Sequence, residues 1–173
     1  MQKYIILILF SILSVGCLSG CDIDDSYRNL EQARQDVFNY FSENQNILEE
    51  NKDLILKNHS LDGISIEKIN QIKYYNNIII FECGNWSMLM NWGEDWGIYY
   101  NVQDIPLNTL HIGSGYNEDL FSKTNDGKYY FWVNQNPNEK CRSCVSERIT
   151  KNWFFYYNEW EGDLSLQCQH IVQ

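Results

Sequence analysis

The most constraining feature of the sequence is a succession of short runs rich in tyrosine, phenylalanine, tryptophan and isoleucine that begins after Gly63. The runs are NNIIIFECGN, WGIYYNV, KYYFWVNQ, VSERIT and NWFFYYNEW, and short polar breaks separate them. Aromatic and β-branched residues favour strands, and Asp126-Gly127 is typical of a hairpin turn. Because no helical pattern lies between the runs, βαβ units are excluded and an antiparallel meander is predicted.

The segment before Gly63, residues 26–58, has a helical period instead. Its apolar residues recur at sums of three and four, while acidic residues occupy the other faces; the apolar residues are Tyr27, Leu30, Val37, Phe38, Phe41, Leu48 and Ile55. This pattern predicts one long helix, or two helices with a break at Ser42, where SENQ resembles a capping box. HSLDG, which ends in Gly63, is expected to terminate the helical region. The predicted fold class is α+β, with the N-terminal helix (one long or two) packed on a mainly antiparallel β-meander sheet.

The first residues of the chain form an export signal in this interpretation. MQKYIILILFSILSVG contains one lysine and then an apolar run, which is shorter than the roughly 20 residues that a spanning helix needs. LSGC at 18–21 resembles the lipobox of bacterial lipoproteins, in which the cysteine is acylated and the preceding peptide is removed. The resemblance implies a signal peptide at 1–20 and a lipid anchor on Cys21. The residues from 21 to 28 are expected to form a tether, and the length of the chain predicts a single domain at 29–173. Asp22 resembles an inner-membrane retention signal if the organism is of the enteric type.

The charge of the chain limits its partners. It carries 13 basic and 23 acidic side chains, which gives a formal net charge of −10. Nucleic-acid binding needs a basic surface, so that class of function is excluded. An acidic balance most often serves solubility, and a cationic partner is the sharper alternative.

Four cysteines remain beyond the lipobox region: Cys83, Cys141, Cys144 and Cys168. An even number of cysteines in an exported domain predicts disulfides, and three pairings exist. The preferred pairing joins Cys141 to Cys144 at a hairpin tip and Cys83 to Cys168 at the C-terminal end. A zinc site from Cys141, Cys144, Cys168 and His170 is less favoured, because the one-residue gap in CQH is unusual for structural zinc. No metal and no cofactor are therefore expected.

The segment GNWSMLMNWGEDWGIYYN concentrates aromatic and methionine residues. Aromatic faces stack on sugars, but they also supply the core and the strand pairs of a small sheet. Methionines in a loop favour a protein contact surface. The candidate interaction surface consists of Trp86, Met88, Met90, Trp92 and Trp96.

No catalytic residues emerge from the sequence, and the chain is not expected to be an enzyme. Glu94 and Asp95 are adjacent, so on an extended segment they point to opposite faces and cannot act on one substrate. His111 lies near Ser114 without a located aspartate, and neither an HExxH nor a Gly-x-Ser-x-Gly pattern occurs.

Two short motifs carry a further resemblance. GIYYNVQDIPL (97–107) and ERITKNWFFYYNEW (147–160) resemble segments of a group of small bacterial lipoproteins and secreted proteins, in which a GIYY-like strand precedes an Asp-x-Pro turn and an ITxNWYYY-like strand closes the domain. The group has no assigned activity, so the resemblance implies architecture alone.

The functional hypothesis combines the anchor with the absence of a catalytic pattern. It is a lipid-anchored binding or interaction module of the bacterial envelope that contacts the bilayer through Cys21 and a protein partner through its domain. An immunity protein against an envelope-acting toxin is its sharpest form. A structural or assembly accessory of an envelope complex and a glycan-binding protein are the alternatives.

Overall fold

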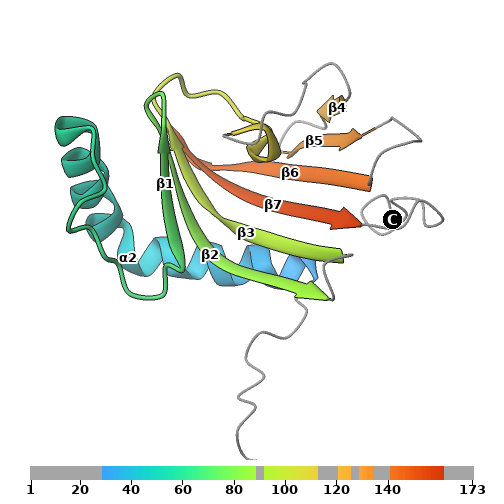
Figure 1. The fold of residues 1–173 in the computed structure, drawn as a ribbon, viewed down its shortest axis with the longest axis horizontal. Coiled ribbons are helices and arrows are strands. Elements are labelled where there is room, and N and C mark those ends of the chain that lie inside the picture. Colours follow the sequence, from blue (N-terminus) through green and yellow to red (C-terminus); the bar gives the residue numbers. More distant parts are fainter. Residues whose placement is uncertain (1–28, 89–91, 113–120, 126–128, 135–140, 162–173) are drawn as a thin grey trace, which may run out of the picture.

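The computed structural model describes residues 29–88, 92–112, 121–125, 129–134 and 141–161 (Figure 1). These ranges form one long helix, seven strands and a short 3-10 helix. They are α2 (Leu30–Asn58), β1 (Gln71–Tyr75), β2 (Ile78–Met88), β3 (Trp92–Asn101), η1 (Thr109–His111), β4 (Phe121–Asn125), β5 (Tyr129–Asn134), β6 (Cys141–Thr150) and β7 (Trp153–Glu161).

The seven strands form one antiparallel sheet with the order β1-β2-β3-β7-β6-β5-β4. It therefore contains two meanders, β1 to β3 and β4 to β7, which lie side by side through β3 and β7 at the centre. Between β3 and β4 the chain passes from the centre of the sheet to its far edge. Helix α2 packs on one face (Figure 1), which confirms the predicted α+β class.

Helix α2 is continuous across Ser42, so the predicted alternative of two helices is wrong. Asn29 caps its start by accepting a hydrogen bond from the Gln32 N–H at 2.9 Å. His59 ends the helix in the left-handed conformation at φ 52°, which is a common helix C-cap geometry. The helix thus stops four residues before Gly63, which occupies a later turn with φ +74°. No helix in the described ranges is both long and apolar enough to cross a bilayer.

The centre of the sheet is buried on both faces. On the helix side, an apolar stripe of α2 meets the strands; the stripe is Ala33, Val37, Phe41, Leu48 and Ile55, and the strands contribute Ile79, Phe81, Ile98, Trp153 and Phe155. On the other face, a smaller cluster packs under the segment that follows β3; it contains Ile80, Tyr99, Phe154 and Tyr156, with Leu107 and Ile112 against them. Burial on both faces explains why the central strands read as continuous apolar runs instead of alternating patterns.

Two strands were not predicted, and a third is longer than expected. β1 and β4 are the two edges of the sheet. The run VSERIT is part of a longer strand, because β6 begins at Cys141, four residues before that run. Edge strands bury little surface, so a short polar segment such as QIKYY lacks the strong pattern of a central strand.

The two motifs that carry the resemblance lie against each other in the structure. Asn152, in the turn between β6 and β7, donates side-chain hydrogen bonds to the carbonyls of Asn101 (2.8 Å) and Val102 (3.0 Å). Its backbone N–H donates to Asp104 Oδ1 at 2.6 Å, and Arg148 pairs with the same carboxylate. The Asp-x-Pro turn therefore clamps the β6–β7 hairpin, and the two motifs form one unit.

Candidate functional site

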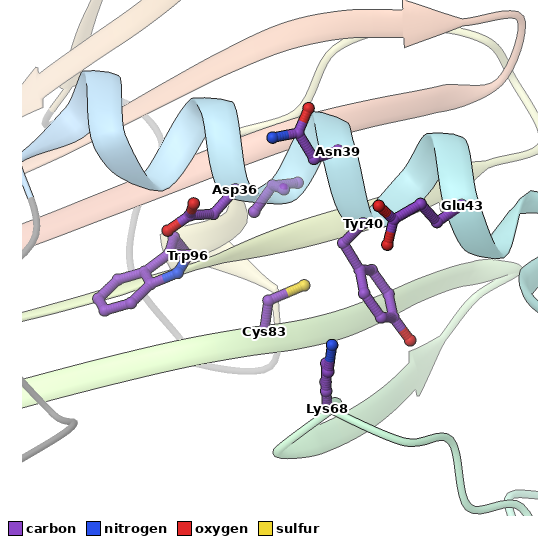
Figure 2. A pocket seen from close by; sticks show the side chains of 8 residues that line it. Asp36, Asn39, Tyr40, Glu43, Lys68, Cys83 and Trp96 are labelled. Atoms are coloured by element: carbon purple, nitrogen blue, oxygen red, sulfur yellow. The ribbon is translucent and has the colours of Figure 1, made fainter.

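A pocket opens between α2 and the sheet (Figure 2). Its volume is about 320 Å³, which lies near the lower end of the range for small-molecule sites. Helix α2, the segment before β1, and strands β2 and β3 line it with Asp36, Val37, Asn39, Tyr40, Glu43, Lys68, Cys83 and Trp96.

The sheet side of the pocket depends on a β-bulge in β2. The register between β2 and β3 shifts at Cys83, directly before Gly84. A Cβ on Gly84 would lie 2.3 Å from a ring carbon of Trp96, and a Cβ on Gly97 would lie 2.1 Å from the Phe81 carbonyl oxygen. Two glycines therefore permit the close approach of β2 and β3 and let the indole of Trp96 lie over Gly84.

The floor of the pocket is apolar. Val37 is 1% exposed and Trp96 is 5% exposed. The thiol of Cys83 points to the phenylalanine carbonyl two residues earlier, with a distance of 3.8 Å from Sγ to the oxygen. Burial raises the pKa of Cys83 to about 12, so at neutral pH the floor carries a protonated thiol and no charge.

The rim of the pocket is charged. Asp36 and Glu43 are exposed residues on one side of α2, and the exposed Lys68 stands on the opposite wall (Figure 2). Between the two acids, the hydroxyl of Tyr40 donates to the Glu67 carbonyl at 2.8 Å. Burial is the main cause that raises the pKa of Tyr40 to about 12. The pocket thus places two carboxylates on the helix wall against one ammonium on the opposite wall.

A buried carboxylate lies beyond Trp96 on the same face of β3. Glu94 is 1% exposed, and its Oε2 has no hydrogen-bond partner among the described residues. Glu159 of β7 stands directly opposite Glu94 in the register. The pKa of Glu94 is raised to about 7, mainly by burial and to a smaller extent by the charge of Glu159. A hydrogen bond from Tyr157 acts in the opposite direction and lowers it.

The neighbouring Asp95 points to the other face of the sheet. Its Oδ2 accepts a hydrogen bond from Asn158 Nδ2 at 3.0 Å. Burial raises the pKa of Asp95 to about 6, and the hydrogen bond from Asn158 opposes this shift. The prediction that Glu94 and Asp95 face opposite sides is confirmed, and they do not form an acid–base pair.

Glu94 should make folding stability fall as pH rises. The pKa of Glu94 is about 7 in the folded state and 4.5 is its ordinary value. Between these two pH values the folded state therefore binds the proton more tightly than the unfolded state. Unfolding should therefore become easier as pH rises from 5 to 8. Between pH 5 and pH 8, the free energy of unfolding should fall by about 2 kcal/mol less in the Glu94→Gln variant than in the parent, since one pKa unit is worth about 1.4 kcal/mol.

Urea denaturation of parent and variant at pH 5 and pH 8 measures this difference. Glu50→Gln, at an exposed position of α2, is the matched control and should keep the parental pH dependence. Equal pH dependence in the Glu94→Gln variant and in the parent would contradict the assignment of the raised pKa to Glu94.

The cysteines depart from the expected pairing. Cys83 and Cys144 are free thiols in the described part of the chain. Cys141 and Cys144 both lie in β6, where residues three apart are about 10 Å from each other. A disulfide needs Cα atoms within about 7 Å, so the expected Cys141–Cys144 bridge is not formed. Cys168 lies outside the described residues, and the pairing of Cys83 with Cys168 stays a prediction.

Cys144 is instead a fully buried core residue. Its Sγ lies 3.5 Å from Thr109 Oγ1, and burial raises the pKa of its thiol to about 12. No group of three metal-ligating side chains occurs among the described residues. His170 and Cys168, which the zinc alternative requires, lie outside them.

The expected aromatic interaction surface is only partly described. Trp96 is buried and stacks on Tyr157 with ring centroids 6.4 Å apart, so it belongs to the core and the pocket, which corrects its assignment to an exposed surface. Trp86 is half-buried against the same core. The side chains of Met88 and Trp92, and the whole of Met90, lie outside the described residues, as does Cys21.

The pocket residues of α2 and Lys68 were missed by sequence reasoning. The helical period assigns Asp36 and Glu43 to the solvent side of an amphipathic helix. Their only sequence signal is that they lie close to residues of the apolar stripe, Asp36 beside Val37 and Glu43 two residues after Phe41. A polar residue beside such a stripe is ordinary, so the pattern alone carries no prediction of a pocket.

Comparison with known proteins gives no information on the function of this chain. The chain matches no family model, no curated protein and no solved structure. The fold and the site define an α+β domain whose single long helix covers an antiparallel sheet and leaves one side of the interface open as a pocket. Because one fold serves many functions, the chemistry of that pocket is the basis for the proposals below.

Proposed function

We propose that the protein is a lipid-anchored binding module of a bacterial envelope, held to the membrane by acylated Cys21. The pocket under α2, with its apolar floor and charged rim, is the observation that supports a binding role. Small-molecule sites are concave and combine apolar surface with placed polar groups; in this pocket the floor is apolar and most of the lining residues are polar. The anchor rests on the LSGC segment behind a short apolar run.

The state of the reactive groups favours binding over turnover. The thiols of Cys83 and Cys144 both have pKa values raised to about 12, and a protonated thiol is a poor nucleophile. Glu94 and Asp95 lie on opposite faces of β3, so they cannot flank one bond of a substrate.

The charge distribution favours a cationic protein partner. Several basic side chains are already held by acidic neighbours within the domain: Arg34 by Glu147, Lys52 by Glu49, Lys73 by Glu82 and Arg148 by Asp104. With a net charge of −10, the molecule keeps a large excess of acidic groups, which would speed association with a basic partner and make it salt-dependent. An immunity protein that captures a basic toxin at the membrane is the sharpest form of this proposal.

Crosslinking of the intact lipoprotein in cells, followed by identification of the captured proteins, tests the partner. Immunity predicts a basic toxin encoded beside the gene, and deletion of the gene should sensitise cells to that toxin. A stoichiometric resident complex would instead identify an envelope accessory. Unchanged sensitivity of the deletion strain to every toxin of sibling cells would exclude immunity.

The anchor is tested by two matched serine substitutions. Cys21→Ser should abolish incorporation of labelled fatty acid and release the chain from the membrane fraction, because the acyl chains supply the membrane affinity. Cys17→Ser, four residues earlier, should leave both unchanged. Mass spectrometry of the mature N-terminus reads the outcome, and labelling that depends on Cys17 would refute Cys21 as the anchor.

A further inference from the structure

We propose that one side of α2 binds a basic amphipathic helix of the partner protein. This surface, the acidic–apolar stripe, begins at the pocket, which Glu43 lines. The stripe consists of Glu43, Ile47, Glu50 and Leu54, and all four side chains are exposed. The inference rests on the function proposed above, because it names the part of the domain that contacts the basic partner.

The apolar residues of the stripe lie outside the core. Ile47 is 46% exposed and Leu54 is 47% exposed, whereas their neighbours Leu48 and Ile55 are buried. The exposed pair is seven residues apart, so the two side chains lie on nearly the same line along α2, about 10 Å from each other at 1.5 Å per residue. Apolar residues that recur every seven positions can pack against a second helix. Helix α2 therefore presents a short apolar row that fits another helix.

An acidic row runs beside the apolar row. Glu43 and Glu50 are also seven residues apart, and each comes four residues before an apolar member of the stripe. Because a helix has 3.6 residues per turn, this spacing displaces the acidic row by about 40° from the apolar row. Among the described residues the two glutamates form no hydrogen bond or ion pair. Charged residues beside the contact line of two helices select the partner through ion pairs, so this row selects lysine or arginine.

The charges around the stripe define the partner helix further. Lys57 follows Glu50 by seven residues, and Lys68 stands on the pocket wall opposite Glu43 (Figure 2). The two glutamates therefore lie between two lysines. A matching helix has its basic residues in the middle of the contact, seven positions apart, beside its own apolar row. The net charge of −10 attracts such a helix to the domain before contact is made.

A second copy of the chain fits the stripe less well. In an antiparallel pair of α2 helices, Ile47 of one copy would meet Leu54 of the other, which brings the two copies of Glu50 to the centre of the contact. Like charges in a contact oppose association, and so does the net charge of −10 on each chain. A basic helix meets the same apolar row without this repulsion.

Photocrosslinking in living cells tests the stripe on the full-length lipoprotein. A benzophenone amino acid replaces Ile47 or Leu54, and the control position is Gln45, an exposed residue about 160° around the helix from Ile47. We expect both stripe positions to form an adduct with the same protein and the control position to form none. Mass spectrometry of the adduct should place the new bond in a helical segment with lysine or arginine residues seven positions apart.

Charge reversal tests the acidic row. Glu43→Lys and Glu50→Lys, each in the chain that carries benzophenone at Leu54, should lower the adduct yield about tenfold, which corresponds to about 1.4 kcal/mol of binding free energy. The control variant Ser42→Lys/Gln45→Lys makes the same change in charge on the opposite side of the helix and should keep the yield. All four positions are exposed, so folding should be unaffected. Glutamate in place of the partner's basic residue nearest the new bond should restore the yield with Glu50→Lys.

The inference is wrong if the stripe positions give no adduct, an adduct of two copies of this chain, or an adduct with a segment that lacks basic residues. Yields that survive both charge reversals would overturn it as well. The crosslinking experiment on the intact lipoprotein separates these failures from failure of the proposed function. A basic partner that is captured there but not at the stripe would refute this surface and leave the proposed function standing. The absence of any basic partner in both experiments would refute both.

Discussion

Replacing Gly97 with alanine is expected to lower the free energy of unfolding by about 3 kcal/mol, near the upper end of the usual cost of overpacking. The added Cβ would lie 2.1 Å from the Phe81 carbonyl oxygen and 3.0 Å from the Cys83 backbone nitrogen. Both obstacles are backbone atoms of β2, and Gly97 of β3 pairs with β2 directly before the bulge. Neither can move aside by changing a rotamer, so the two strands must separate. The midpoint and slope of urea denaturation measure the loss.

Gly84→Ala is the matched control, because its obstacle is a side chain. Its Cβ would lie 2.3 Å from the ring of Trp96. A smaller residue at Trp96 should relieve this contact, so Gly84→Ala should cost about 1 kcal/mol less in a Trp96→Leu background than in the parent. Gly97→Ala should cost about as much in either background. Gly97→Ala with parental stability would show that the close approach of β2 and β3 does not occur.

Replacing Arg34 with leucine is expected to cost about 3–5 kcal/mol, the range for breaking one half of a buried ion pair. The guanidinium of Arg34 on α2 makes two hydrogen bonds to Glu147 of β6, Nε to Oε2 at 2.5 Å and Nη2 to Oε1 at 2.8 Å. Glu147 is only 4% exposed, so its carboxylate has little access to water once the arginine is gone. Urea denaturation at neutral pH measures the cost.

The double variant Arg34→Leu/Glu147→Leu separates the cost of an unpaired charge from the value of the pair. Apolar residues in place of both partners should recover most of the stability that Arg34→Leu removes, because no buried charge is left without a partner. Arg34→Lys should fall between the parent and the leucine variant, since lysine keeps the charge but lacks the two-pronged geometry. A double variant that is less stable than Arg34→Leu would contradict this explanation.

The two pairs of substitutions examine contacts made by the helix and the strands that line the pocket. Gly97 and Gly84 set how β2 and β3 approach each other below the pocket. Arg34 ties α2 to β6 two residues before Asp36, so it positions the helix wall that carries the rim acids.

Much of the fold could be predicted from local patterns. The strands at the centre of the sheet have strong aromatic and β-branched runs, and the helix has its own apolar period, so both were recognised. β1 and β4 were missed because edge strands need little apolar surface. The sequence alone does not decide whether α2 continues across Ser42, because a capping-box pattern can also lie inside a helix.

The candidate site was less predictable than the fold. Trp96 was recognised as an aromatic of interest, but its burial follows from Tyr157 and Gly84, which lie on other strands. Cys144 was expected at a hairpin tip and lies inside β6, where the spacing of a strand prevents the bridge to Cys141. The sequence gives no reason to single out the surface charges Asp36, Glu43 and Lys68. They line a pocket only because β2 and β3 pack beneath the helix.

The sequence by itself determined the helix, the strand-rich remainder and the acidic balance, because these depend on the spacing of side chains along a short stretch of chain. The tertiary structure alone decided that β3 pairs with β7, which brings Trp96 opposite Tyr157 and joins the two meanders. Backbone hydrogen bonds are the same for every residue type, so pairing between distant strands is set by how both faces bury their side chains together. The pocket exists only as a consequence of that packing.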